Sequence, residues 1–203
     1  MNSDPKDPRS IQLRQILDEV TDLTSSPLYP YRIENGYRPV VGQGNHYAKI
    51  MFVGEAPGEN EAKTGHPFCG ASGRILDELL VSISLKREDV YVTNVVKDRP
   101  PKNRDPEPQE IALYGPFLEK QIEIIQPDVV ATLGRHSMVY IMNTYGLAGR
   151  LASISLIHGQ KFAIKTSTRN ITYIPLYHPA VALYGASKKP MLLEDFQLLK
   201  EFV

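Results

Sequence analysis

Short apolar runs alternate with amphipathic stretches along most of this 203-residue chain. Four runs rich in β-branched and other apolar residues predict buried strands at residues 49–54, 90–96, 129–133 and 171–176. Apolar positions at helical spacing predict helices at residues 11–20, 74–82, 110–125, 135–145 and 191–202. Buried strands that alternate with helices are typical of an α/β fold in which helices cover both faces of a parallel sheet.

Polar and proline-rich segments separate these elements. Residues 1–9 are polar, and we expect them to form a disordered tail. Ser10 is a suitable N-cap for the first helix. We expect residues 10–203 to form a single domain. Four prolines predict a loop at residues 97–108. Residues 151–176 contain short alternating segments that indicate further strands. Because ligands bind beyond the carboxyl ends of the strands in such sheets, we expect a site in the segments that follow the strands.

The composition excludes several classes of protein. Lys and Arg number 23, as do Asp and Glu, so a nucleic acid would have to bind a local basic patch. The one cysteine, Cys69, excludes a disulfide framework within the chain and a metal site made of several cysteines. No apolar run approaches the roughly 20 residues of a membrane span. We therefore expect a soluble, cytoplasmic protein that acts as a monomer and has no membrane partner.

Two features after the first predicted strand have the chemistry of a binding loop. Gly54 opens the segment GEAPG, whose glycines and proline can shape a tight loop that exposes backbone N–H groups to a phosphate or a base edge. Phe68 lies in the polar segment that follows, where an aromatic ring can stack on a base. The simpler interpretations are a strand-to-helix turn and an aromatic residue that fills the core.

Two polar side chains follow other predicted strands. Asn94 comes near the end of the second strand, and its amide offers the donor and the acceptor that match one edge of uracil. His178 follows the last strand, at the edge of the sheet where ligands bind. A turn-forming asparagine and a structural histidine are the alternatives.

The proline-rich loop carries four cations within eight residues, and these are Lys97, Arg99, Lys102 and Arg104. Prolines that hold this loop extended would suit a segment that follows the phosphates of a nucleic acid. Two aspartates dilute its positive charge, so an ordinary solvated loop is the alternative.

These motifs occur in one order at the ends of successive predicted strands. GEAPG is followed by TGHPF-x-G, then by YVTNVVK-x-RPPKNR-x-P, LG and PLYHPA, and this combination resembles the family 4 uracil-DNA glycosylases over residues 10–203. The resemblance implies a three-layer α/β/α sandwich around a four-stranded, mainly parallel sheet. It also implies a DNA repair enzyme that flips uracil out of single- or double-stranded DNA and hydrolyses its N-glycosidic bond, which leaves an abasic site.

The resemblance assigns roles to residues that match the family's motifs. Phe68 would stack on the flipped uracil, Asn94 would read its Watson–Crick edge, and His178 would donate to uracil O2 as a catalytic group. Residues 179–184 would enter the duplex and fill the vacated space, and the DNA-binding residues of this segment would be Leu183 and Tyr184.

The water-activating group is less well defined by the resemblance. Ala56 stands where related glycosylases of another family have Asp, and Ala56 and Gly54 would both line the base. Glu55 would orient the water, stabilise the cationic sugar or hold the loop through backbone N–H groups, and we expect a mixed electrostatic and loop-holding role.

Members of this family usually hold a four-iron cluster with four cysteines, and this chain has lost all four. By resemblance, the ligand positions are occupied here by Leu23, Ser26, Asp98 and Tyr114. Iron–sulfur clusters need thiolates, and Cys69 falls in the predicted uracil loop, so we expect no cluster and no other cofactor. Packing and hydrogen bonds would then anchor the loops, with Leu23 and Tyr114 burying surface.

Three other functions fit parts of this pattern. A nucleic-acid-binding protein could keep the fold without catalysis, but it would not need Phe68, Asn94 and His178 together. A glycosylase for another deaminated base is the second alternative. The third is a covalent uracil trap that uses a histidine such as His136, although the chain lacks the extended basic insertion that such traps need after the first motif.

Overall fold

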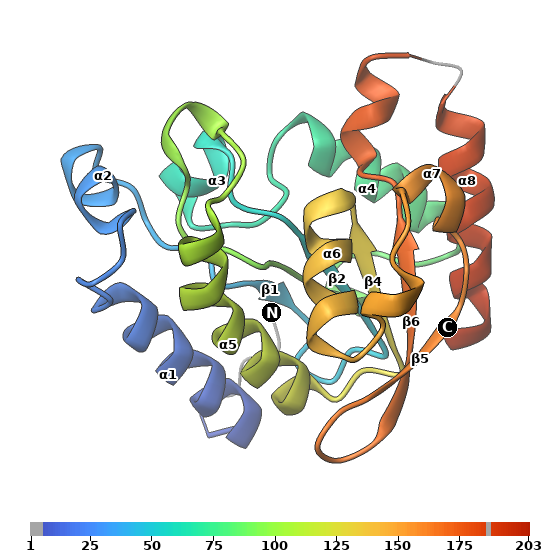
Figure 1. The fold of residues 1–203 in the computed structure, drawn as a ribbon, viewed down its shortest axis with the longest axis horizontal. Helices are drawn as coiled ribbons and strands as arrows, with labels where there is room; N and C mark the ends of the chain where they lie inside the picture. Colours follow the sequence, from blue (N-terminus) through green and yellow to red (C-terminus); the bar gives the residue numbers. More distant parts are fainter. Residues whose placement is uncertain (1–5, 186–187) are drawn as a thin grey trace.

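One six-stranded sheet organises the protein, whose computed structural model describes residues 6–185 and 188–203 (Figure 1). The strands lie in the order β1-β3-β2-β4-β6-β5. Their bounds are β1 Gln43–Gly44, β2 Ile50–Gly54, β3 Tyr91–Asn94, β4 Val129–Leu133, β5 Phe162–Lys165 and β6 Asn170–Leu176. β2 pairs in parallel with β3 and with β4, and β4 pairs in parallel with β6, whereas β1 and β5 pair antiparallel at the two edges.

The sheet therefore has six strands rather than the expected four. The four central strands are the ones that the apolar runs predict, and they are all parallel. β1 contributes only two residues beside β3, and a strand of two residues leaves no periodic pattern in a sequence. β5 lies in the segment where short strands were expected, and it adds the second antiparallel edge beside β6.

Helices cover both faces of this sheet (Figure 1). α1, α5 and α6 pack against one face, and α4 and α8 pack against the other. The bounds of the helices are α1 Pro8–Thr21, α2 Tyr29–Glu34, α3 Glu59–Thr64, α4 Ala71–Val81, α5 Pro108–Ile125, α6 Arg135–Thr144, α7 Ile154–Ile157 and α8 Lys189–Gln197. The predicted closing helix at residues 191–202 is α8 followed by a 3-10 segment, Leu198–Phe202.

The two apolar faces explain why the central strands show no alternating pattern in the sequence. Successive side chains of a strand point to opposite faces of a sheet. Met51 and Val53 of β2 pack with α1, α5 and α6, whereas Ile50 and Phe52 pack with α4 and α8. Because every residue of β2 is buried, both sets of positions must be apolar.

The first helix begins earlier than the sequence pattern predicts. α1 starts at Pro8, and its N-cap is Asp7, whose carboxylate accepts the backbone N–H of Ser10 at 2.8 Å. Residues 1–5 of the predicted tail lie outside the described residues. Within the described ranges, no helix has both the length and the apolar character needed to cross a membrane.

Candidate active site

The carboxyl ends of β2, β3 and β6 meet at one edge of the sheet beside a cleft of about 290 Å³. Six residues predicted from the sequence line this cleft, and they are Glu55, Ala56, Phe68, Asn94, Arg104 and His178. Gly54, the last residue of β2, lies next to two of these residues, Asn94 and Phe68. A Cβ atom at Gly54 would come within 2.2 Å of Asn94 Oδ1 and 3.0 Å of the Phe68 ring, so only glycine permits this close approach.

Asn94 presents an unused hydrogen-bond donor at the cleft. It is the last residue of β3, it is 2% exposed, and its Nδ2 has no hydrogen-bond partner within the described part of the chain. An unsatisfied buried donor costs about 1–3 kcal/mol. The amide is therefore set to bind an acceptor supplied by a ligand. Lys97 Nζ donates to the backbone carbonyl of Asn94 at 2.5 Å, which fixes the end of the strand.

The loop conformation at Phe68 and a hydrogen bond to Glu61 place the Phe68 ring at the cleft. Phe68 has a φ of 52°, which is uncommon for a residue other than glycine, and its side chain is buried. Its N–H donates to Glu61 Oε1, and Glu61 Oε2 accepts the N–H of Gly58 at 2.6 Å. The carboxylate of Glu61 thus links Gly58, just before α3, to Phe68, in the loop after α3.

The sequence analysis missed Glu61. The available signal was its position as the third residue of a helix that begins after a glycine, where a glutamate reaches back to the N-cap N–H. Burial raises the pKa of Glu61, and the two N–H groups that donate to its carboxylate oppose that shift.

His178 is a neutral hydrogen-bond donor at the cleft. Its ring stacks beside Phe68 with a centroid distance of 5.6 Å and an interplanar angle of 28°. Burial lowers the pKa of His178 to about 4, so the ring is neutral near pH 7. The N–H of Ala180 donates to its Nδ1 at 3.1 Å, and a neutral ring that accepts at Nδ1 carries its proton on Nε2.

Glu55 lies where the cleft meets a second group of ionisable side chains. Its carboxylate is 3.8 Å from His136 Nε2, and the same nitrogen is 3.2 Å from Asp105. Burial raises the pKa of Glu55, while His136 opposes the shift. No described backbone N–H donates to the Glu55 carboxylate, so the loop-holding part of its expected role falls to Glu61.

Glu55, Asp105 and His136 have the ligand types of a divalent-cation site. However, the Arg135 guanidinium lies 2.9 Å from His136 Nε2 and 3.3 Å from Asp105, and its charge opposes a second cation. His136 is not among the residues that line the cleft. The geometry therefore gives no support to a covalent trap built on this histidine.

One of the four predicted DNA-binding cations is inside the protein. Lys97 is fully buried, and its Nζ donates to Thr93 Oγ1 at 2.9 Å and to Gln121 Oε1 at 2.6 Å. Burial also lowers the pKa of Lys97 far below its ordinary value. The prediction that Lys97 binds DNA is therefore wrong, because the fold supplies acceptors that turn this side chain inward.

The remaining part of the loop is folded rather than extended. Pro101–Asn103 forms a short 3-10 segment in which Lys102 and Asn103 have φ angles of 56° and 55°. Lys102 is exposed at this turn and has no ion-pair partner among the residues described. It is therefore well placed to meet a phosphate.

Arg99 and Arg104 are both tied to the protein. Arg99 donates to the Tyr37 hydroxyl at 2.6 Å and to Asn103 Oδ1 at 2.7 Å. Arg104 pairs with the buried Glu110 at 2.6 Å. Arg99 is also buried and pairs with Glu59 at 3.4 Å, whereas Arg104 lines the cleft with a fixed orientation.

Leu183 and Tyr184 lie at the end of the segment after His178. Pro179–Leu183 forms a short 3-10 helix, and the side chains of Leu183, its last residue, and Tyr184, which follows it, are 47% and 91% exposed. Large apolar side chains of this kind can insert between base steps and displace a base. Their exposure fits the predicted contact with DNA.

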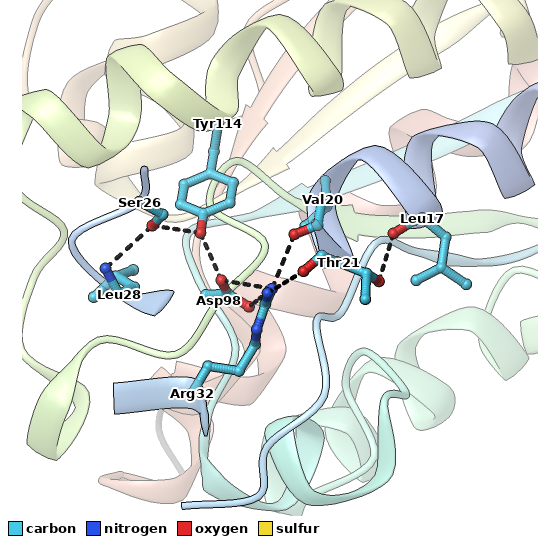
Figure 2. A network of polar contacts seen from close by, with 8 residues as sticks. All are labelled: Leu17, Val20, Thr21, Ser26, Leu28, Arg32, Asp98 and Tyr114. Atoms are coloured by element: carbon cyan, nitrogen blue, oxygen red, sulfur yellow. Dashed lines mark hydrogen bonds and ion pairs between the residues drawn. The ribbon is translucent and has the colours of Figure 1, made fainter. Parts of the chain in front are cut away.

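A polar network includes Ser26, Asp98 and Tyr114, which stand at three of the four expected positions of the cluster ligands (Figure 2). The Tyr114 hydroxyl lies 2.6 Å from Asp98 Oδ2 and 2.7 Å from Ser26 Oγ, and Asp98 forms a 3.0 Å ion pair with Arg32. Tyr114 is fully buried and Leu23 is partly buried against the core, as expected. With no thiolate at these positions, the residues do not fit an iron–sulfur cluster.

Comparison with known proteins shows the family of this chain. The family model for the uracil DNA glycosylase superfamily matches residues 41–200, which defines the class of protein. The type-4 uracil-DNA glycosylase of Sulfurisphaera tokodaii is 44% identical over 190 residues, which cover 93% of this chain and 84% of the relative. That of Thermotoga maritima is 40% identical over 195 residues, or 95% of each chain. The chain belongs to the type-4 uracil-DNA glycosylase family.

Proposed function

We propose that this protein is a uracil-DNA glycosylase, a hydrolase that removes uracil from DNA in repair. The observation that carries the proposal is the buried, unpartnered Nδ2 of Asn94, which shares one cleft with the Phe68 ring and a neutral His178. A pyrimidine offers a π-face to a ring, a polar edge to an amide and a carbonyl to an N–H donor. The three side chains therefore match one base.

Uracil within a duplex must be flipped out before it can reach this cleft. Phe68 would stack on the flipped base, an interaction worth about 1–3 kcal/mol. Asn94 Nδ2 would donate to uracil O4, while its Oδ1 would accept the N3–H group. Gly54 and Ala56 leave room for the base because neither has a side chain that extends beyond Cβ.

His178 supplies the donor that the reaction needs. When the bond between sugar C1′ and uracil N1 breaks, the electron pair stays on uracil and positive charge develops on the sugar. The Nε2–H of His178 would donate to O2, where part of the negative charge accumulates. Because this interaction strengthens in the transition state, it raises the reaction rate more than it tightens substrate binding.

A water molecule completes the hydrolysis by forming a bond to C1′ and releasing a proton. Ala56 has no group that could orient this water, which leaves Glu55 as the carboxylate of the GEAPG segment at the cleft. We assign Glu55 an electrostatic role toward the water and the cationic sugar. The absence of any backbone N–H donor to its carboxylate, among the residues described, supports that role.

The DNA would lie across the face of the protein that carries residues 97–104 and the exposed side chains of Leu183 and Tyr184. Lys102 and Arg104 supply positive charge on one side of the cleft, and Leu183 and Tyr184 supply apolar side chains that can insert between bases. The cleft is complete within one chain, which supports action as a monomer.

Excision from single-stranded, U:G and U:A oligonucleotides tests this function directly. We expect free uracil and an alkali-labile abasic site, and we expect the His178→Ala variant to lose most of this activity. A protein that binds these oligonucleotides but leaves uracil in place would be a binding protein on the same fold. Release of hypoxanthine or xanthine without uracil would identify a glycosylase for another deaminated base.

A further inference from the structure

A buried guanidinium joins three segments that are distant in the sequence (Figure 2). Arg32 of α2 donates to both carboxylate oxygens of Asp98, at 3.2 and 3.0 Å. It also donates to the carbonyl of Val20 at 2.9 Å and to the carbonyl of Thr21, the last residue of α1. The side chains of Arg32 and Asp98 are 3% and 1% exposed, so this contact is shielded from water.

The charges in this network hold one another in place. Carbonyl groups at a helix C-terminus carry partial negative charge, which favours a cation such as Arg32 beside the end of α1. The Tyr114 hydroxyl of α5 donates to Asp98, so the carboxylate is bound from two directions. Because an unpaired buried charge costs several kcal/mol, neither Arg32 nor Asp98 can leave the other without a large penalty.

Asp98 also stands at the start of one wall of the cleft. Pro100, Asn103 and Arg104 line the cleft, and Lys102 lies exposed on the same turn. A displacement of Asp98 would therefore move both the wall of the cleft and the cations that face DNA.

We infer that Arg32 is a positioning residue for uracil excision, and that its ion pair with Asp98 sets the place of residues 98–104 against DNA. Three residues of this network, Ser26, Asp98 and Tyr114, stand at positions where the family resemblance places cluster ligands, and the network anchors the loop with charges instead. The inference rests on the proposed function, and it adds a residue that contacts neither the base nor the DNA.

A paired substitution tests the inference without leaving a buried charge alone. Arg32→Met combined with Asp98→Asn removes both charges, and Arg169→Met combined with Asp128→Asn is the matched control at an exposed ion pair. The measurements are the melting temperature, the affinity for undamaged duplex DNA, and KM and the single-turnover rate for uracil excision well below the melting temperature.

We expect the Arg32/Asp98 variant to bind DNA about tenfold more weakly and to raise KM by about the same factor, which is the effect of about 1.4 kcal/mol. The excision rate at saturating DNA should stay within about threefold of the wild type, because the base-binding groups are intact. The control should change none of these quantities. A variant that melts earlier but keeps its DNA affinity and KM within about twofold would make Arg32 purely structural and overturn the inference.

A milder variant covers the case in which the paired substitution prevents folding. In Arg32→Lys, a single ammonium cannot bind the α1 carbonyls and both oxygens of Asp98 together, so KM should rise by about threefold, and an unchanged KM would overturn the inference. If the wild-type protein does not excise uracil, the proposed function fails. The affinity for undamaged DNA would still decide whether Arg32 positions the loop.

Discussion

The backbone N–H of Ala180 donates to Nδ1 of His178, and this one hydrogen bond decides which ring nitrogen carries the proton. The proton on Nε2 of His178, the proposed donor to uracil, is thus set by a residue only two positions further along the chain. Burial removes the alternative of a charged ring, because it holds the pKa of His178 at about 4. In the proposed mechanism, the departing uracil would therefore be stabilised by an oriented dipole rather than by a full charge.

Removing the His178 imidazole should slow the chemical step. We expect His178→Ala to lower the single-turnover rate of uracil excision by about 10²–10³-fold, the usual scale for losing one donor to a developing anion. Affinity for uracil-containing DNA should change far less. A variant with wild-type rate would exclude His178 from catalysis, whereas parallel losses of DNA affinity and melting temperature would indicate that it only holds its loop.

The low pKa of His178 has a consequence for the pH dependence of activity. Since the folded protein holds this pKa at about 4, below the ordinary value of 6.5, the neutral donor persists down to about pH 4. The stability that comes from keeping this ring neutral is present above pH 6.5 and is lost as the pH falls toward 4. We expect no loss of excision rate with a midpoint near pH 6.5. Single-turnover rates measured in a Glu55→Gln background separate this titration from that of Glu55.

A charge on the base-reading side chain should oppose uracil binding. Asn94→Asp replaces the Nδ2 donor by a carboxylate oxygen that would face uracil O4. We expect a loss of excision of about 10–100-fold, the equivalent of the 1–3 kcal/mol of an unsatisfied polar contact. Asn143→Asp, at an exposed position of α6, is the control and should be neutral. Excision within a factor of two of the wild type would exclude Asn94 from base reading.

Salt dependence should report the phosphate contacts of the basic loop. With Lys97 and Arg99 buried, the loop offers Lys102 and Arg104, and about two phosphate contacts predict a slope of about −2 for log K against log salt. Replacing Lys102 by Ala should reduce the magnitude of that slope by about 0.9. Lys200→Ala, near the C-terminus, is the control. An unchanged slope in Lys102→Ala would place the DNA surface elsewhere.

The protein should purify without iron. Tyr114 is hydrogen-bonded to Ser26 and to Asp98, Asp98 pairs with Arg32, and none of these residues is a thiolate. We expect no visible absorption from a cluster, and we expect a chelator to leave the melting temperature and the excision rate unchanged. Stoichiometric iron and sulfide in the purified protein would contradict this prediction.

The central strands and the cleft could be predicted from the sequence for the same physical reason. Each of these strands is buried on both faces, so it leaves an apolar run, and the polar residues that follow such runs must gather at one edge of the sheet. That reasoning located Asn94 and His178. It could not locate the two residues of β1, because pairing at an edge depends on the neighbouring strand and not on a local pattern.

The contacts of Lys97 and Arg32 lay beyond sequence reasoning. Lys97 follows an apolar run and begins a cationic loop, so its charge suggested solvent, yet Gln121 and Thr93 bind it inside the protein. Arg32 pairs with Asp98, 66 residues further along the chain. No local spacing predicts such a partner, because only the docking of α1 and α2 beside the end of β3 brings the two charges together.

The network of Figure 2 also bears on the order of events during folding. Arg32 and Asp98 are separated by 66 residues, and Ser26 and Tyr114 by 88, so loops of that length must close before the network can form. A half-formed network would bury a charge without its counterion, which costs several kcal/mol. We therefore expect the hydrogen-bonded backbone amides of Asn103 and Arg104 to exchange with solvent only through global unfolding, as hydrogen exchange can measure. Faster exchange confined to this loop would show that it opens independently.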